Sequence, residues 1–194
     1  ETYILQPRNP VDFDLLVETV RPTPSLEDVD VVIGLRGPIA PSEMCPGLGL
    51  YIVVFDQIYS FPRDTLFAAI RAPEKATDDQ KKHISASAQD LWNRIAKVAD
   101  NAGATDEHRA LNYLAVSYDR IYTHTSERYL NDFDFTRVDV IPSRLSGIRK
   151  LLNVTFSYTH RQTGVTEKYR VRVDVTEEFP FLDRGLEPYY DIER

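Results

Sequence analysis

The stretch LLNVTFSYTHRQTGVTEKYRVRVDVT (residues 151–176) decides the fold of this chain. Apolar and polar residues alternate along both of its halves, as in strands with one buried face. The apolar positions are Leu152, Val154, Phe156, Tyr158, Tyr169, Val171, Val173 and Val175. Residues 160–164 fit a hairpin loop ending in a glycine that tolerates a positive φ. With the run that starts at Phe133, this pattern predicts a three-stranded β-meander with one solvated face, suited to support or partner binding.

Two long helices are predicted before the meander. Thr77 and Gln80 form a capping-box signature at the start of the first helix, and Gly103 fits the residue that follows its end. Thr105 fits the N-cap of the second helix, whose apolar stripe continues without a break through Tyr122. Because the connection between the helices is short, we expect an antiparallel helical hairpin over about residues 77–131.

The N-terminal part, about residues 1–75, has the order strand, helix, strand, strand, helix. Asn9 and Pro10 start its first helix as N-cap and first helical residue. Apolar runs at residues 29–35 and 50–58 are predicted strands. We therefore expect one α+β domain over residues 1–194, with a strand-helix-strand part, a central helical hairpin, and a C-terminal antiparallel meander and tail (about residues 133–194). The aromatic tail after residue 176 either packs on the body or docks on a neighbour.

Composition excludes several classes of protein. The net charge of −7 argues against a non-specific nucleic-acid binder, which needs a basic surface to release counterions. No apolar run of 18 residues is present, so we expect no membrane span. Cys45 is the single cysteine, which precludes an intrachain disulfide and fits a reducing compartment. Because the chain starts at Glu1, without a methionine and already strand-like, we expect it to be part of a longer polypeptide.

The sequence contains no catalytic motif. His83, His124 and His160 are weak candidates for metal ligands, but a metal site needs at least three converging ligands, and surface histidines are the simpler interpretation. Gly47 and Gly49 precede a predicted strand instead of following one, so they do not form a dinucleotide fingerprint. We therefore expect no catalytic residue and no cofactor.

A basic row on the solvated face of the last predicted strand is the candidate binding site. It consists of Lys168, Arg170 and Arg172. One interpretation pairs these cations with acids such as Asp139, Asp174 or Glu167 across the sheet. The other is docking of an acidic peptide through charge-assisted hydrogen bonds.

Five segments carry a resemblance to a known family. They are ETYILQPRNPVDFDLLVETVRPTPS (residues 1–25), DVDVVIGLRGPIAPSEMC (28–45), IVVFDQIYSFPRDTL (52–66), ADNAGATDEHRALNYLAV (99–116) and SYTHRQTGVTEKYRVRVDVTEEFPF (157–181). On these segments the chain resembles the C-terminal domain, of unknown function, of PatG-type cyanobactin maturation proteins. The resemblance implies a multidomain parent with a subtilisin-like protease that macrocyclises a ribosomal precursor peptide, and in some members a thiazoline oxidase. It also implies a bacterial cytoplasm.

The protease residues of that family lie in another domain, and no residue of this chain matches a protease motif. We therefore expect a non-catalytic interaction domain that binds the precursor peptide, other proteins of the pathway or another copy of the chain. The alternatives are an oligomerisation spacer and, less favoured, a metal-assisted enzyme built on the three histidines.

Overall fold

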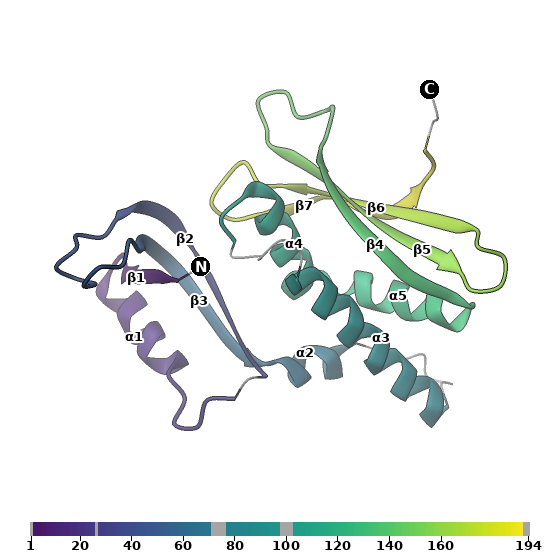
Figure 1. Cartoon of the computed structure of the whole chain (residues 1–194), viewed down its shortest axis with the longest axis horizontal. Helices are drawn as coiled ribbons and strands as arrows, with labels where there is room; N and C mark the ends of the chain where they lie inside the picture. The colour runs from purple at the N-terminus through teal and green to yellow at the C-terminus, as the bar shows by residue number, and fades with distance from the viewer. Residues whose placement is uncertain (1, 26, 71–76, 98–102, 192–194) are drawn as a thin grey trace. The chain divides into compact units, whose positions relative to one another are not determined.

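The computed structural model (Figure 1) describes residues 2–25, 27–70, 77–97 and 103–191. The chain divides into two compact units, Glu1–Leu66 and Phe67–Arg194. Both mix helices with strands, which confirms the predicted α+β class. No helix among these residues is long and apolar enough to cross a membrane.

The first unit is a small mixed sheet with one helix beside it. Its elements are β1 (Tyr3–Pro7), α1 (Pro10–Thr19), β2 (Asp28–Ile39) and β3 (Tyr51–Pro62), followed by α2 (Arg63–Ala69), which continues past the end of the unit. The strand order is β1-β3-β2, with β1 parallel and β2 antiparallel to β3. Asn9 and Asp12 cap α1 reciprocally: each side chain accepts from the backbone N–H of the other residue, at 3.1 and 3.0 Å.

Gly34 permits the close approach of β2 to β3. A Cβ atom at this position would lie 2.5 Å from Val54 O and 2.7 Å from Phe55 Cα. Gly34→Ala is therefore expected to push the strands apart and to lower the free energy of unfolding of this unit by about 2 kcal/mol. Hydrogen exchange of the β2 and β3 amides measures the loss. Gly37→Ala is the matched control, because its Cβ would lie 3.4 Å from Ile52 O; equal losses at both positions would contradict the steric account.

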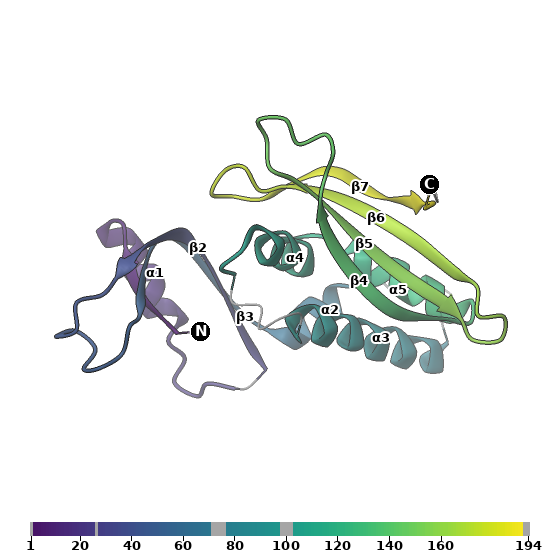
Figure 2. The ribbon, with the colours of Figure 1, turned by 45° about the horizontal axis from the view of Figure 1, so that its top comes forward.

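The second unit packs helices on one face of a four-stranded sheet (Figure 2). Its helices are α3 (Asp78–Lys97), α4 (Asp106–Ser117) and α5 (Arg120–Leu130). Its strands are β4 (Phe133–Pro142), β5 (Leu151–His160), β6 (Thr166–Asp174) and β7 (Phe181–Tyr189), antiparallel in the order β4-β5-β6-β7. The predicted meander is confirmed, but it has a fourth strand, since the aromatic tail packs on the body as β7.

The predicted second helix is broken. Tyr118 leaves the helical conformation (φ −128°, ψ 84°), so that α4 ends at Ser117 and α5 starts at Arg120. The apolar stripe continues across the break, and for this reason the sequence pattern did not reveal it. The predicted Thr77–Gln80 capping box and the Thr105 cap are present, and Gly103 has a positive φ of 72°.

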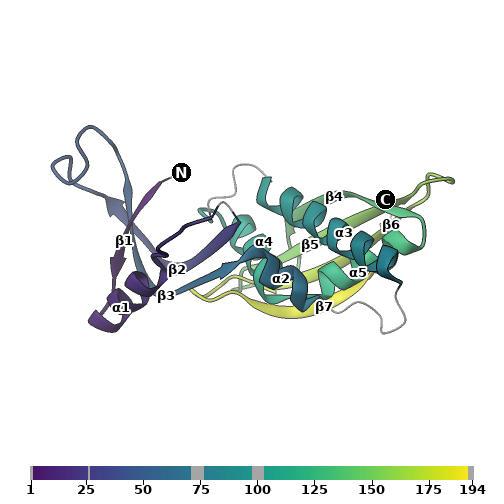
Figure 3. The ribbon, with the colours of Figure 1, turned by 90° about the horizontal axis from the view of Figure 1, so that it is seen from below.

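The core of this unit lies between the helices and the inner sheet face (Figure 3). Val154, Phe156 and Tyr158 of β5 are fully buried there, and Tyr158 Oη lies 2.9 Å from Thr125 Oγ1 of α5. The register of β4 against β5 shifts between Phe135 and Arg137. Phe135 and Val138 are three residues apart, so in a regular strand they would point to opposite faces. The bulge adds one residue and lets both face the same core.

Candidate functional site

The basic row lies on the outer face of the sheet, opposite the helices. Lys168, Arg170 and Arg172 of β6 stand beside Ser157, Thr155 and Asn153 of β5 in register. These three polar β5 residues are buried, so the predicted solvated face is covered along its centre. On the outer face, these short polar residues lie between charged side chains of the two neighbouring strands. The charged residues are Arg137 and Asp139 of β4, and Lys168, Arg170 and Arg172 of β6.

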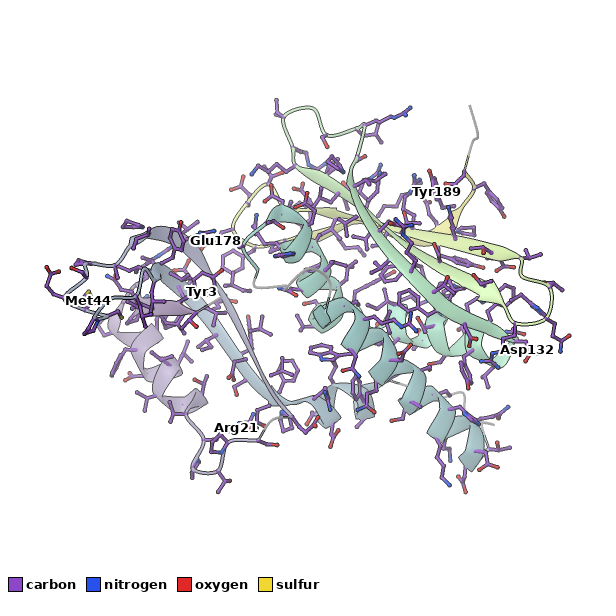
Figure 4. All side chains as sticks on the ribbon, viewed as in Figure 1. Tyr3, Arg21, Met44, Asp132, Glu178 and Tyr189 are labelled. Atoms are coloured by element: carbon purple, nitrogen blue, oxygen red, sulfur yellow. The ribbon has the colours of Figure 1, made fainter. Side chains whose placement is uncertain are left out.

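Carboxylates from β7 and from Asp191, just after it, pair the whole basic row. Arg172 Nε donates to Asp183 Oδ2 at 2.6 Å and Arg170 Nη2 donates to Glu187 Oε1 at 3.1 Å. The Arg170 guanidinium also lies 4.7 Å from the centre of the Tyr189 ring, and Tyr189 is labelled in Figure 4. Lys168 Nζ donates to Asp191, and this hydrogen bond raises the pKa of Lys168.

The row is thus ion-paired, as one of the two interpretations expected, but with different acids. Asp139, Asp174 and Glu167 pair with Arg137, Arg149 and Arg128 instead. Sequence reasoning missed the observed partners because it did not identify β7 as a strand. An acidic peptide on this row would have to displace the carboxylates of Asp183, Glu187 and Asp191, and docking there stays a prediction.

The three candidate histidines serve separate local contacts. His83 stacks on the Tyr129 ring at 5.6 Å between centroids, and His160 Nδ1 accepts from the N–H groups of Gln162 and Thr163. His124 is buried, with the Tyr169 and Tyr158 ring centres 4.1 and 5.5 Å away. In the described part of the chain, no three His, Cys, Asp or Glu side chains are placed to hold a metal ion.

Burial controls the electrostatics of His124. Burial, together with the nearby Arg128 guanidinium and against the opposing effect of Glu127, lowers the pKa of the imidazole to about 4. The Nδ1 atom lies 3.6 Å from Glu127 Oε2, and Nε2 has no hydrogen-bond partner within the described residues. This histidine is therefore a neutral core residue at pH 7.

One edge of the sheet is closed by a helix. The N–H groups of Leu182 and Leu186 on β7 donate to the hydroxyl oxygens of Tyr113 and Tyr118, at 3.1 and 3.0 Å. Arg109 of α4 donates to three backbone carbonyl oxygens just before β7, those of Val175, Glu177 and Glu178. Side chains from α4 and its C-cap therefore satisfy groups that an additional strand would need.

The opposite edge, on β4, is open. Ser143 N donates to Leu151 O at 2.7 Å, and alternate residues of a strand turn their main-chain groups to the same side. Ile141, Asp139 and Arg137 consequently face β5, whereas Val138 and Val140 turn their N–H and C=O groups outward. No described segment outside the sheet hydrogen-bonds to these outward groups.

The residues of the open edge were not among the predicted site residues. Their signal was present, because polar and apolar residues alternate from Arg137 to Val140, but alternation identifies a strand and not its place in the sheet. Only the topology shows that β4 is an edge strand and that α4 covers the other edge.

Comparisons with known proteins agree with this fold. A family model described as PatG C-terminal matches residues 78–189, more than half of the chain. A solved structure described as "PatG Domain of Unknown Function" aligns with a TM-score of 0.64 and 14% sequence identity, covering 96% of this chain and 76% of that chain. At this identity the likeness shows the fold alone. A search of curated proteins returned no match.

Proposed function

Since this chain belongs to the PatG C-terminal family, a domain of unknown function in cyanobactin maturation enzymes, we propose that it is a non-catalytic interaction domain that binds an extended peptide segment beside β4. The proposal rests on a difference between the two edges of the sheet: one edge is covered by other parts of the unit and the other is not. Contacts from α4 close β7, whereas the outward main-chain groups of Val138 and Val140 are left for a partner. Strand addition of this kind takes its affinity from main-chain hydrogen bonds.

The shape of β4 limits where a peptide strand can pair. The bulge at Thr136 interrupts the strand on one side, and Pro142 contributes no N–H group at its end. The usable segment is therefore about five residues, from Arg137 to Ile141. The precursor peptide of the pathway is the occupant that we propose.

Val140→Pro is expected to weaken binding of the precursor peptide at least about tenfold, measured by isothermal titration calorimetry. The substitution removes an outward N–H group but no hydrogen bond to β5, so the sheet itself should remain folded. Val140→Ala keeps the N–H group and separates the side-chain contribution from the main-chain contribution. Two results would contradict the proposal. One is that the unsubstituted chain does not bind the peptide. The other is that Val140→Pro changes neither the binding nor the thermal unfolding midpoint.

A further inference from the structure

We propose that the open edge of β4 also accepts β4 of a second copy of this chain, antiparallel and with the two Val138 residues opposite each other. This inference rests on the proposed strand addition and names a further occupant for the same edge. It follows from the charges that flank Val138 and from the direction of its main-chain groups.

The charge pattern of β4 is complementary to itself. Arg137 and Asp139 point to the outer face on either side of Val138, and their side chains pair within the strand at 2.6 Å. About 73% of the Arg137 side chain is exposed, so its guanidinium is accessible to another molecule. In an antiparallel pair centred on Val138, Arg137 of each copy lies opposite Asp139 of the other. Opposite charges placed in this way stabilise a strand pair.

Other arrangements of two β4 strands are disfavoured by the same charges. A parallel pair in register places Arg137 opposite Arg137 and Asp139 opposite Asp139. An antiparallel pair centred on Asp139 places the two carboxylates against each other. Like charges directly opposite destabilise a strand pair, so the sequence Arg137-Val138-Asp139 favours the antiparallel pair centred on Val138 over both of these arrangements.

The main chain fits this register. Val138 turns its N–H and C=O groups outward, and two such residues opposite each other exchange both hydrogen bonds. The Val138 side chains of the two copies then meet on the inner side of the sheet edge. Because the bulge at Thr136 and the proline at 142 limit pairing to a short segment, the association should be weak and reversible.

Two charge reversals test the register. Arg137→Asp gives a strand with two acids, and Asp139→Arg gives a strand with two bases. Each variant alone should self-associate at least about tenfold more weakly than the unchanged chain in sedimentation velocity over a concentration series. Mixed in equal amounts, the two variants should associate with each other as tightly as the unchanged chain does with itself, within about threefold, because both cross-strand pairs are then attractive.

Arg144→Asp is the matched control. It makes the same charge change in the exposed β4–β5 loop, outside the pairing segment, and should leave association unchanged. Three results would overturn the inference: each single reversal associates as tightly as the unsubstituted chain, the mixture of the two reversals does not regain that affinity, or the unsubstituted chain stays monomeric at all concentrations. If that monomer binds precursor peptide and Val140→Pro abolishes the binding, only the second copy is excluded. If the chain self-associates and the charge reversals have the expected effects, but no precursor peptide binds, then only peptide binding at this edge is excluded.

Discussion

Replacing Asp174 with alanine is expected to lower the free energy of unfolding of the second unit by about 3 to 4 kcal/mol. The Asp174 side chain is almost fully buried at the end of β6, and it accepts three hydrogen bonds and forms an ion pair with Arg149. Arg149 Nε donates to Oδ2 at 2.6 Å, and Arg149 Nη2 lies 2.5 Å from the same atom in an ion pair. Thr176 N and Oγ1 donate to Oδ1 at 2.8 and 2.5 Å. Alanine leaves these donors without their acceptor in a partly buried site. Urea denaturation followed by circular dichroism measures the loss.

The carboxylate charge and the acceptor geometry are separable. Asp174→Asn retains one acceptor oxygen for Thr176 but removes the charge that pairs with Arg149, so about half of the loss is expected. Asp183→Ala is the comparison, because Asp183 contacts both Arg149, at 3.1 Å, and Arg172, at 2.6 Å, but is more exposed than Asp174. It should cost less than Asp174→Ala. A cost below about 1 kcal/mol for Asp174→Ala would show that these hydrogen bonds contribute little net stability.

The same carboxylate predicts acid sensitivity. Burial alone would raise the pKa of Asp174, but the hydrogen bonds from Thr176 and Arg149 outweigh burial and hold its pKa below the ordinary value of 3.8. A carboxyl group whose pKa is lower in the folded state stabilises the fold above its unfolded pKa. That contribution is lost as the pH falls below about 4.

The meander was predictable because its two central strands each carry apolar residues on one face and polar residues on the other. Alternation with a period of two is then visible in the sequence, and the residues from Leu152 to Tyr158 pair antiparallel with those from Glu167 to Val173. The strand β7 was not predictable in this way, because Gly185 and Pro188 lie within it and its pattern is not a strand pattern. Tertiary contacts hold it in place. A Cβ atom at position 185 would lie 3.2 Å from Tyr118 Oη, so glycine leaves room for the hydroxyl that covers this edge.

Which edge of the sheet is open could not be predicted from the sequence. Tyr113 and Tyr118 have the spacing of ordinary helix residues, and nothing in that spacing shows that their hydroxyl groups reach β7. The partners of the basic row depend on the same strand. Missing β7 therefore concealed both the ion pairs of Arg170 and Arg172 and the difference between the two edges.

The second unit is expected to lose about 3 kcal/mol of stability when the pH falls from 7 to below 4, through His124 alone. Its pKa of about 4 in the folded state lies below the value of 6.5 for an unfolded histidine, because burial disfavours the imidazolium. The neutral form is the one that folding favours, so its contribution is complete above pH 6.5. Stability then falls as the pH drops from 6.5 to about 4, and by pH 5 about 2 kcal/mol should be gone.

The groups around the imidazole explain why protonation is costly. Arg120 and Arg128 of α5 repel a second cation, and Glu127 compensates only in part, while β5 and β6 contribute the rings of Tyr158 and Tyr169. His124→Phe keeps an aromatic ring in this site and cannot be protonated. Between pH 7 and below pH 4, the unsubstituted chain should therefore lose about 3 kcal/mol more unfolding free energy than this variant. His83→Gln, at an exposed position, should leave the pH dependence unaltered. Parallel pH profiles for the unchanged chain and His124→Phe would mean that the buried imidazole is not what makes the fold sensitive to mild acid.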